Sequence, residues 1–203
     1  MIYVSGERIE NIDVSLYEHL FHEPVSSPAA LWYIGPSLED LFTFDRVAVV
    51  GSRDVTKDGK SAAFELGANL ARNSSVVISG LALGIDTAAF EGALSEGGRC
   101  IAILPSGFNQ IVPRSNIGLA ECILQNGGAL LSEYAENVGP RKYHYLERNR
   151  LIAAFSTKLI LGESKDNGGA RNALQHAWDL NRPTFQLEND GDLTEIFNPQ
   201  RRL

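Results

Sequence analysis

The sequence predicts an α/β fold: a Rossmann-like, doubly wound, mostly parallel sheet with helices on both faces. From Arg46 onward, short unbroken apolar runs recur along the chain, and segments with helical spacing of apolar residues separate them. A glycine or a polar residue follows nearly every run. Strands that are apolar along their whole length are buried on both faces, which requires a layer of helices on each side of the sheet.

The apolar runs and the helical segments between them define the expected elements in chain order. VAVV, VVIS, CIAILP, ALLSEY, KLILGE and PTFQLE predict strands at 47–50, 76–79, 100–105, 129–134, 158–163 and 183–188. Apolar residues at helical spacing predict helices at about 59–72, 85–96, 115–126, 148–155 and 169–180.

The residues before Arg46 differ from this pattern, because aromatic and polar residues are mixed there and prolines at 24, 28 and 36 interrupt them. We expect a short helix near 14–22 followed by an irregular lead-in. The expected organisation is an N-terminal extension over 1–45, the α/β domain over 46–188 and a tail over 189–203.

Composition narrows the class of protein. The chain has 203 residues, a formal net charge of −7 and 44% hydrophobic residues, which suits one globular domain rather than a disordered chain. Two cysteines do not make a disulfide framework. No apolar run approaches the ~20 residues of a membrane span, and no signal peptide is visible, so we expect a cytoplasmic protein.

Glycine and polar residues gather where the predicted strands end. Gly51-Ser52-Arg53 follows the first strand, and the second runs into the segment 79–86, SGLALGID. Further polar residues follow the next three strands, at 105–107, 132–134 and 163–169. Open parallel sheets bind ligands beyond the carboxyl ends of their strands, so this edge is the candidate functional site.

The chemistry of this edge favours anion binding. Gly80 and Gly84 allow close approach of the backbone, helices starting near 85 and 169 present free N–H groups, and Arg53 is a bidentate phosphate donor. The alternative is that the glycines only make tight turns and Arg53 is a surface charge. Asp86 is a candidate helix cap. Neither G-x-G-x-x-G nor a Walker A loop is present.

A second cluster is the stretch 141–150, RKYHYLERNR, which holds four lysines or arginines, one histidine and two tyrosines in an acidic protein. Cations that follow phosphates and rings that stack on bases are typical of proteins that bind single-stranded nucleic acid. A solvated helix start is the alternative. No metal-ligand spacing, cofactor motif or nucleophile motif is visible, so we expect a binding protein rather than an enzyme.

Several motifs together resemble the DNA-processing protein A (DprA/Smf) family. They are GSR, SGLALGID, GGRCIAILPSGF, VPRSN, GGALLSEY, RNRLIA and GGARNALQHA, spread over about 31–187. The resemblance implies an extended Rossmann fold that binds single-stranded DNA, forms a homodimer and hands the strand to a RecA-type recombinase in DNA uptake and recombination. The implied binding residues are Gly51, Ser52, Arg53, Ser79, Gly80, Ala82, Gly84, Lys142, Tyr145, Arg148, Asn149, Arg150, Gly168 and Gly169.

The expected dimer contact is the last strand and helix, about 169–187, because a sixth strand at the sheet edge leaves backbone groups unpaired.

Two rival functions use a related fold: a phosphoribohydrolase-like enzyme and a module that senses a phosphorylated nucleotide. The enzyme pattern P-G-G-x-G-T-x-x-E has Gln175 in place of its carboxylate here, and Arg171 in place of a glycine.

Overall fold

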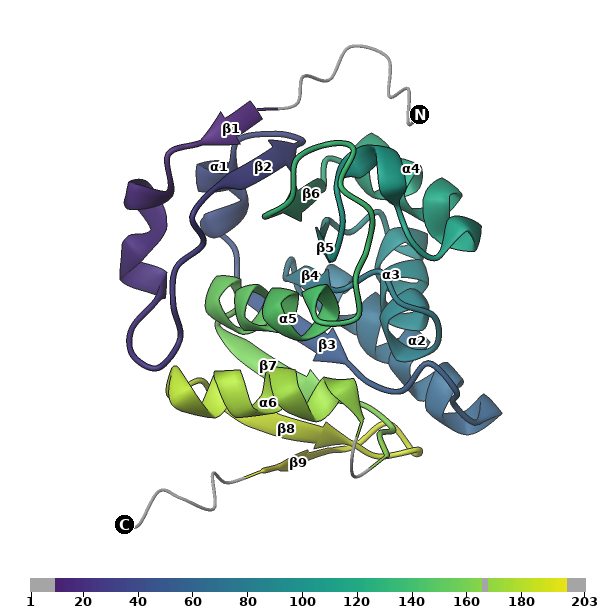
Figure 1. Cartoon of the computed structure of the whole chain (residues 1–203). Helices are drawn as coiled ribbons and strands as arrows, with labels where there is room; N and C mark the ends of the chain where they lie inside the picture. The colour runs from purple at the N-terminus through teal and green to yellow at the C-terminus, as the bar shows by residue number, and fades with distance from the viewer. Residues whose placement is uncertain (1–9, 166–167, 197–203) are drawn as a thin grey trace.

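The computed structural model describes residues 10–165 and 168–196 and contains a nine-stranded sheet. The six predicted strands are confirmed as β3 (Arg46–Val50), β4 (Val76–Ser79), β5 (Cys100–Leu104), β6 (Ala129–Ser132), β7 (Lys158–Leu161) and β8 (Thr184–Leu187). They run parallel in the order β6-β5-β4-β3-β7-β8 at the centre of the sheet (Figure 1).

The five predicted helices are also present. They are α2 (Lys57–Arg72), α3 (Ile85–Ser95), α4 (Ile117–Gln125), α5 (His144–Phe155) and α6 (Gly169–Asp179), with short 3-10 turns at Phe108–Gln110 and Arg114–Asn116 before α4. Helix α5 begins four residues earlier than the sequence predicts. Its first turn therefore contains aromatic residues of the basic cluster.

No helix of the described residues is long and apolar enough to cross a membrane.

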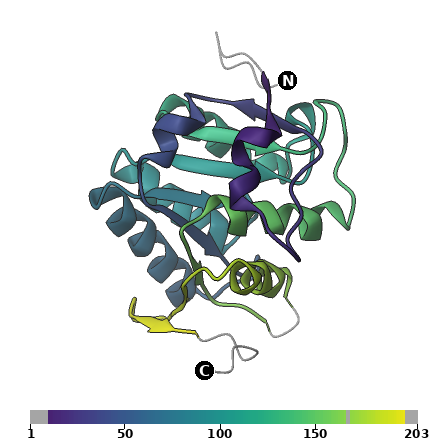
Figure 2. The same cartoon turned by 90° about the vertical axis from the view of Figure 1, so that its left-hand side faces the viewer.

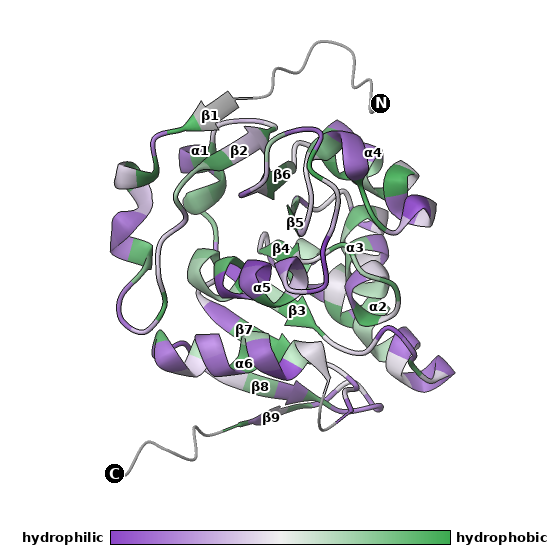
Figure 3. Cartoon of the chain, in the orientation of Figure 1, coloured by the Kyte–Doolittle hydropathy of each residue, from purple (hydrophilic) through white to green (hydrophobic). Residues whose placement is uncertain are grey.

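The two helical layers lie on opposite faces of the sheet (Figure 1, Figure 2). Alternate residues of β3 show how the core is divided: Val47 and Val49 pack with α2, α3 and α4, whereas Ala48 and Val50 pack with α5 and α6. Hydrophobic residues are concentrated in the central strands, and hydrophilic residues cover the outer turns of the helices (Figure 3). The strands are thus buried on both faces, as their continuous apolar sequence predicts.

The order of the strands creates a switch point between β3 and β7. From β3 the chain moves through β4, β5 and β6 in one direction, and α5 then returns it to β7 on the other side of β3. At such a reversal the connections leave adjacent strands toward opposite faces, which opens a crevice beyond their carboxyl ends.

The short helix expected near 14–22 is present, but the rest of the lead-in before Arg46 is more regular than expected, and that part of the expectation is corrected. It contains β1 (Glu10–Ile12), a 3-10 helix η1 (Val14–Leu20), β2 (Leu31–Ile34) and α1 (Leu38–Phe42). Strand β2 pairs antiparallel with β6 and β1 pairs antiparallel with β2, so both extend the sheet. In Figure 2 the purple lead-in lies against the green α5.

The other edge of the sheet also differs from the expectation. Strand β9 (Leu193–Glu195) pairs antiparallel with β8 and covers its outer edge. The premise that β8 leaves its backbone unpaired is therefore wrong. The predicted tail reaches beyond this strand, and its residues 197–203 lie outside the described part of the chain.

Candidate nucleic-acid interface

A cleft of about 320 Å³ opens at the switch point. Four segments line it: residues 50–54 at the end of β3, Ala82 and Asp86 after β4, residues of α5, and Ser164 and Lys165 together with the start of α6. Of the candidate residues, it brings together Gly51, Ser52, Arg53, Ala82, Tyr145, Arg148, Asn149, Gly168 and Gly169. The predicted functional edge is thus a cleft formed where two strand ends meet two helix starts.

Arg53 and Tyr145 lie together at this cleft. The guanidinium carbon of Arg53 is 4.8 Å from the centre of the Tyr145 ring, which is a cation–π contact. Both residues also line a second pocket of about 250 Å³, whose other walls include Leu83, Val112 and Pro113. The cation and the ring therefore border two neighbouring cavities, one mixed in polarity and one mainly apolar.

The glycines after β3 and β4 serve internal packing. A Cβ atom on Gly51 would lie 2.4 Å from the Ile85 side chain, and one on Gly84 would lie 2.1 Å from the carbonyl oxygen of Ser52. Gly84 also has a φ of +79°, which favours glycine. For Gly51, Gly80 and Gly84, tight packing rather than approach to a ligand accounts for the residue type, since a Cβ on Gly80 would collide with the Arg148 guanidinium.

Three N–H groups in and just after the loop that follows β4 have partners within the protein. The Asp86 carboxylate accepts hydrogen bonds from the Gly80 and Ala82 N–H groups at 3.1 and 3.3 Å, and the Ile85 N–H donates to Ser52 O at 3.2 Å. Asp86 caps the loop of its own helix. The Ile85 N–H at the start of this helix is therefore not free for a ligand, in contrast to the expectation of free N–H groups there.

Arg148 lies beneath the cleft as a buried cation, with only 4% of its surface exposed. Its guanidinium donates to the carbonyl oxygens of Gly80 (2.8 Å) and Ile103 and to the Asn149 side chain. Burial lowers the pKa of Arg148 to about 10, so the group remains charged at neutral pH. Burial raises the pKa of Asp86, and the positive charge of Arg148 opposes that shift.

The start of α6 faces the cleft with open backbone. A Cβ on Gly169 would meet nothing within 4 Å, and the Asn149 side-chain amide donates to Gly169 O at 3.0 Å. Asn149 thus fastens α5 to α6 and sets the position of this helix start. Lys165 adds a cation at the cleft, where it forms an exposed ion pair with Asp54 at 3.2 Å.

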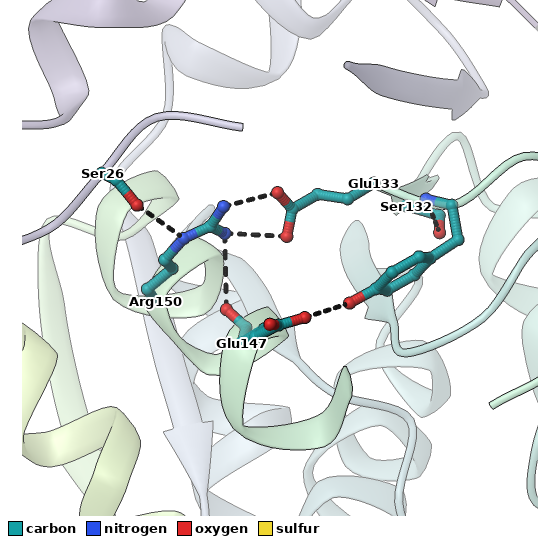
Figure 4. Close-up of polar contacts among 6 residues, drawn as sticks. Ser26, Ser132, Glu133, Glu147 and Arg150 are labelled. Carbon is teal, nitrogen blue, oxygen red and sulfur yellow. Dashed lines mark hydrogen bonds and ion pairs between the residues drawn. The ribbon is translucent and has the colours of Figure 1, made fainter. Parts of the chain in front are cut away.

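Arg150 and Lys142 do not line the cleft. The Arg150 guanidinium forms a two-pronged ion pair with Glu133 and also bonds to Ser26 and to the backbone of Glu147, as Figure 4 shows. It therefore ties α5 to the end of β6 and to the lead-in. Lys142 is exposed three residues before Tyr145, in the segment leading into α5.

The two candidate serines have internal roles. Ser79 is fully buried, and its hydroxyl donates to Val49 O at 2.6 Å. The Ser52 hydroxyl donates to Asp54 O at 2.6 Å and stabilises the turn after β3. Ser79 therefore holds two strands together beneath the site, and Ser52 shapes the cleft wall.

Ser164 and Lys165 also line the cleft, and both belong to the polar segment 163–169 that the sequence places at this edge, although they are not among the binding residues that the resemblance implies. In the sequence they follow directly after β7, and the structure places β7 beside β3, so that both residues face the cleft. Within the described ranges, no group of three or more His, Cys, Asp or Glu side chains could hold a metal. Gln175, at the position of the rival enzyme's carboxylate, bonds to Asp179 at 2.9 Å and does not line the cleft.

Fold and cleft together define a Rossmann-like domain with a cleft at the switch point of a mostly parallel sheet. The family model of DNA recombination-mediator protein A matches residues 10–197, and the chain belongs to this family. This matches the resemblance found in the sequence motifs.

Two curated relatives show how much of their length is shared. The chain is 37% identical over 165 residues to the DNA processing protein DprA of Streptococcus pneumoniae, covering 81% of this chain and 57% of the relative. It is 36% identical over 160 residues to protein Smf of Escherichia coli, covering 79% of this chain and 42% of that protein. The chain thus spans about half the length of these relatives.

Solved structures agree with this assignment. DNA processing protein A from Helicobacter pylori, described for its unique single-stranded DNA binding mode, superposes with a TM-score of 0.79 at 29% identity, covering 93% of this chain and 83% of that one. A molybdenum cofactor binding protein from Rippkaea orientalis reaches a TM-score of 0.52 at 20% identity over 70% of this chain and 76% of the other. That second likeness shows the fold alone.

Proposed function

We propose that this chain binds single-stranded DNA without base preference and takes part in DNA processing during uptake and recombination. The observation that carries the proposal is the Arg53 guanidinium stacked on the Tyr145 ring at the cleft. A cation for a phosphate and a ring for a base are the two groups that sequence-independent single-strand binding requires. The single-stranded DNA binding described for the Helicobacter pylori relative supports the same function.

In this proposal each wall of the cleft has a separate task. Arg53 binds a phosphate, Tyr145 stacks on a base, and the open backbone of Gly169 lets the strand approach the start of α6. Lys142 adds an exposed cation just outside. Arg148 and Asn149 position these groups, since their polar atoms bond to protein partners. The proposed activity is binding, with no reaction.

Alanine at Arg53 or at Lys142 should weaken binding to oligo-dT and should reduce the slope of log K against log salt by roughly 0.7 for each phosphate that the variant no longer neutralises. The measurement is a fluorescence-anisotropy titration at several salt concentrations. Arg72→Ala is the matched control, because Arg72 lies at the end of α2 in an exposed ion pair with Glu96, outside the cleft. Binding and slopes equal to those of the parent chain in both test variants would contradict this site.

We further propose that the chain forms a homodimer and hands its strand to a RecA-type recombinase, as the family resemblance implies. One sheet edge that could form a twofold contact is β9, whose three residues are all exposed and whose outer side is unpaired among the described strands. Two DNA clefts on one particle would raise the avidity for a strand that spans both.

Light scattering at micromolar concentration tests the dimer. We expect a mass near twice the 22.1 kDa of the single chain. A mass that stays at the monomer value, even after a long oligonucleotide is added, would contradict the dimer and leave single-strand binding by one chain untouched.

A further inference from the structure

Exposed apolar side chains concentrate around the candidate interface. Among the described residues, the large apolar side chains with high exposure are Leu16, Leu83, Val138, Tyr143, Leu146 and Leu193. Two of these line the two cavities: Leu146 lines the cleft and Leu83 lines the second pocket. Val138, Tyr143 and Leu146 all lie within residues 138–146, at and before the start of α5. Single exposed apolar residues are ordinary, but a cluster beside a cleft marks a binding surface.

Tyr143 is the exposed end of a row of three rings. The Tyr134 ring stacks on His144 at 3.9 Å with an interplanar angle of 18°, and the Tyr143 ring meets His144 edge-on at 4.6 Å and 89°. His144 is buried, and its Nδ1 lies 3.0 Å from Pro105 O. The row is therefore anchored to the loop after β5, while Tyr143 remains 49% exposed.

The Tyr143 ring is also held from its hydroxyl end. Arg141 donates a hydrogen bond to the Tyr143 hydroxyl at 3.1 Å, and Arg141 and Lys142 are both exposed. The nearest acidic side chain along the helix, Glu147, accepts a hydrogen bond from the Tyr134 hydroxyl at 2.9 Å. A ring that is held in place before binding loses little conformational entropy when a ligand stacks on it.

We propose that Tyr143 is a second stacking platform, which holds the nucleotide next to the one bound at the cleft, so that the strand leaves the cleft across the start of α5. The proposal rests on the proposed function and assigns a role to Arg141, Tyr143 and Leu146, which lie in the basic stretch 141–150 but are not among the binding residues that the family resemblance implies. Exposed cations directly beside an exposed ring favour a nucleic acid over a protein partner, since the ring binds a base while the cations bind its phosphates.

Oligo-dT strands of two lengths test the proposal by anisotropy. For a strand of about 12 nucleotides, which suits the site size of such surfaces, Tyr143→Ala should raise Kd about 5- to 150-fold, the range that follows from removing one base stack. Tyr143→Phe should weaken binding much less than Tyr143→Ala, because it keeps the ring and loses only the hydrogen bond from Arg141. For an oligo-dT shortened to a single nucleotide, which has no neighbouring nucleotide to place on Tyr143, Tyr143→Ala should bind as the parent chain does.

Comparison variants separate the possible outcomes. Leu16→Ala, an exposed apolar residue of η1, is the matched control and should leave both affinities unchanged. If Tyr145→Ala weakens binding while Tyr143→Ala does not, the platform is wrong and the cleft stands. If Tyr143→Phe weakens binding as much as Tyr143→Ala, the hydroxyl rather than the ring matters and stacking is wrong. If the parent chain binds neither strand, the proposed function fails and the platform with it.

Discussion

Replacing Arg148 by methionine should lower the free energy of unfolding by at least about 1–3 kcal/mol, the cost of leaving a buried hydrogen-bond acceptor without its donor. Methionine keeps the apolar stem of the side chain and removes the charge. Asp86 would then remain buried without the positive charge that opposes its desolvation, and the carbonyl oxygens of Gly80 and Ile103 would have no donor from this side chain. Arg148 and Asp86 are 4% and 5% exposed, so water cannot readily replace these interactions.

Urea unfolding measures this destabilisation. Arg72→Met is the control, since Arg72 makes an exposed ion pair and should cost less than about 1 kcal/mol. The double variant Arg148→Met/Asp86→Asn removes both charges, and its destabilisation should be smaller than the sum for the two single variants because the groups are coupled. A destabilisation below about 1 kcal/mol for Arg148→Met would contradict the role of this network.

The same variant distinguishes positioning from direct contact with DNA. Under conditions where it is folded, Arg148→Met should weaken binding without changing the salt dependence of log K, because its guanidinium is directed at protein carbonyls. A slope lower by roughly 0.7 would assign Arg148 a phosphate contact instead. Two arginines of the R-N-R motif thus have structural partners: Arg148 beneath the cleft, and Arg150 on Glu133.

Strands and helices with local signals could be predicted from the sequence. The runs from Val47 to Val50 and from Val76 to Ser79 are apolar and β-branched, and burial on both sides leaves such segments few alternatives. Position along the chain also placed the site at the strand ends, because the geometry of a parallel sheet brings those ends to one edge. These features depend on residues close in sequence or on the sheet as a whole.

The remaining site details depend on contacts between distant residues. Gly80 packs on Arg148, which lies 68 residues further along, so no local pattern reveals that this glycine makes room for a guanidinium. The same holds for Arg150. The R-N-R motif predicts this cation at the candidate interface, but its guanidinium is engaged in the ion pair with Glu133. A basic residue in a motif is free for a ligand only if the fold supplies no carboxylate.

The lead-in was mispredicted for a related reason. Its strand β2 is only four residues long and is stabilised by pairing with β6, which lies far along the chain at Ala129–Ser132. Its aromatic residues gather around Phe155 at the end of α5: the ring centre of Phe42 lies 5.7 Å from that of Phe155, and those of Tyr17 and Phe21 each lie 6.1 Å away. Packing with α5 therefore orders a segment whose own sequence predicts little regular structure.

Phe155→Ala should therefore destabilise the fold by about 3–5 kcal/mol and should release the lead-in, because the cavity removes the central ring of this aromatic cluster. Phe90→Ala is a matched control: Phe90 is equally buried, at 0% exposure, but it packs in the core on the opposite face of the sheet with α2 and α4. Both variants should show a similar decrease in the free energy of unfolding in urea. Only Phe155→Ala should speed amide exchange or proteolysis within residues 14–34, under conditions where both proteins are folded. Equal protection of that segment in the two variants would mean that β2–β6 pairing alone orders the lead-in, and that the aromatic cluster does not hold it to α5.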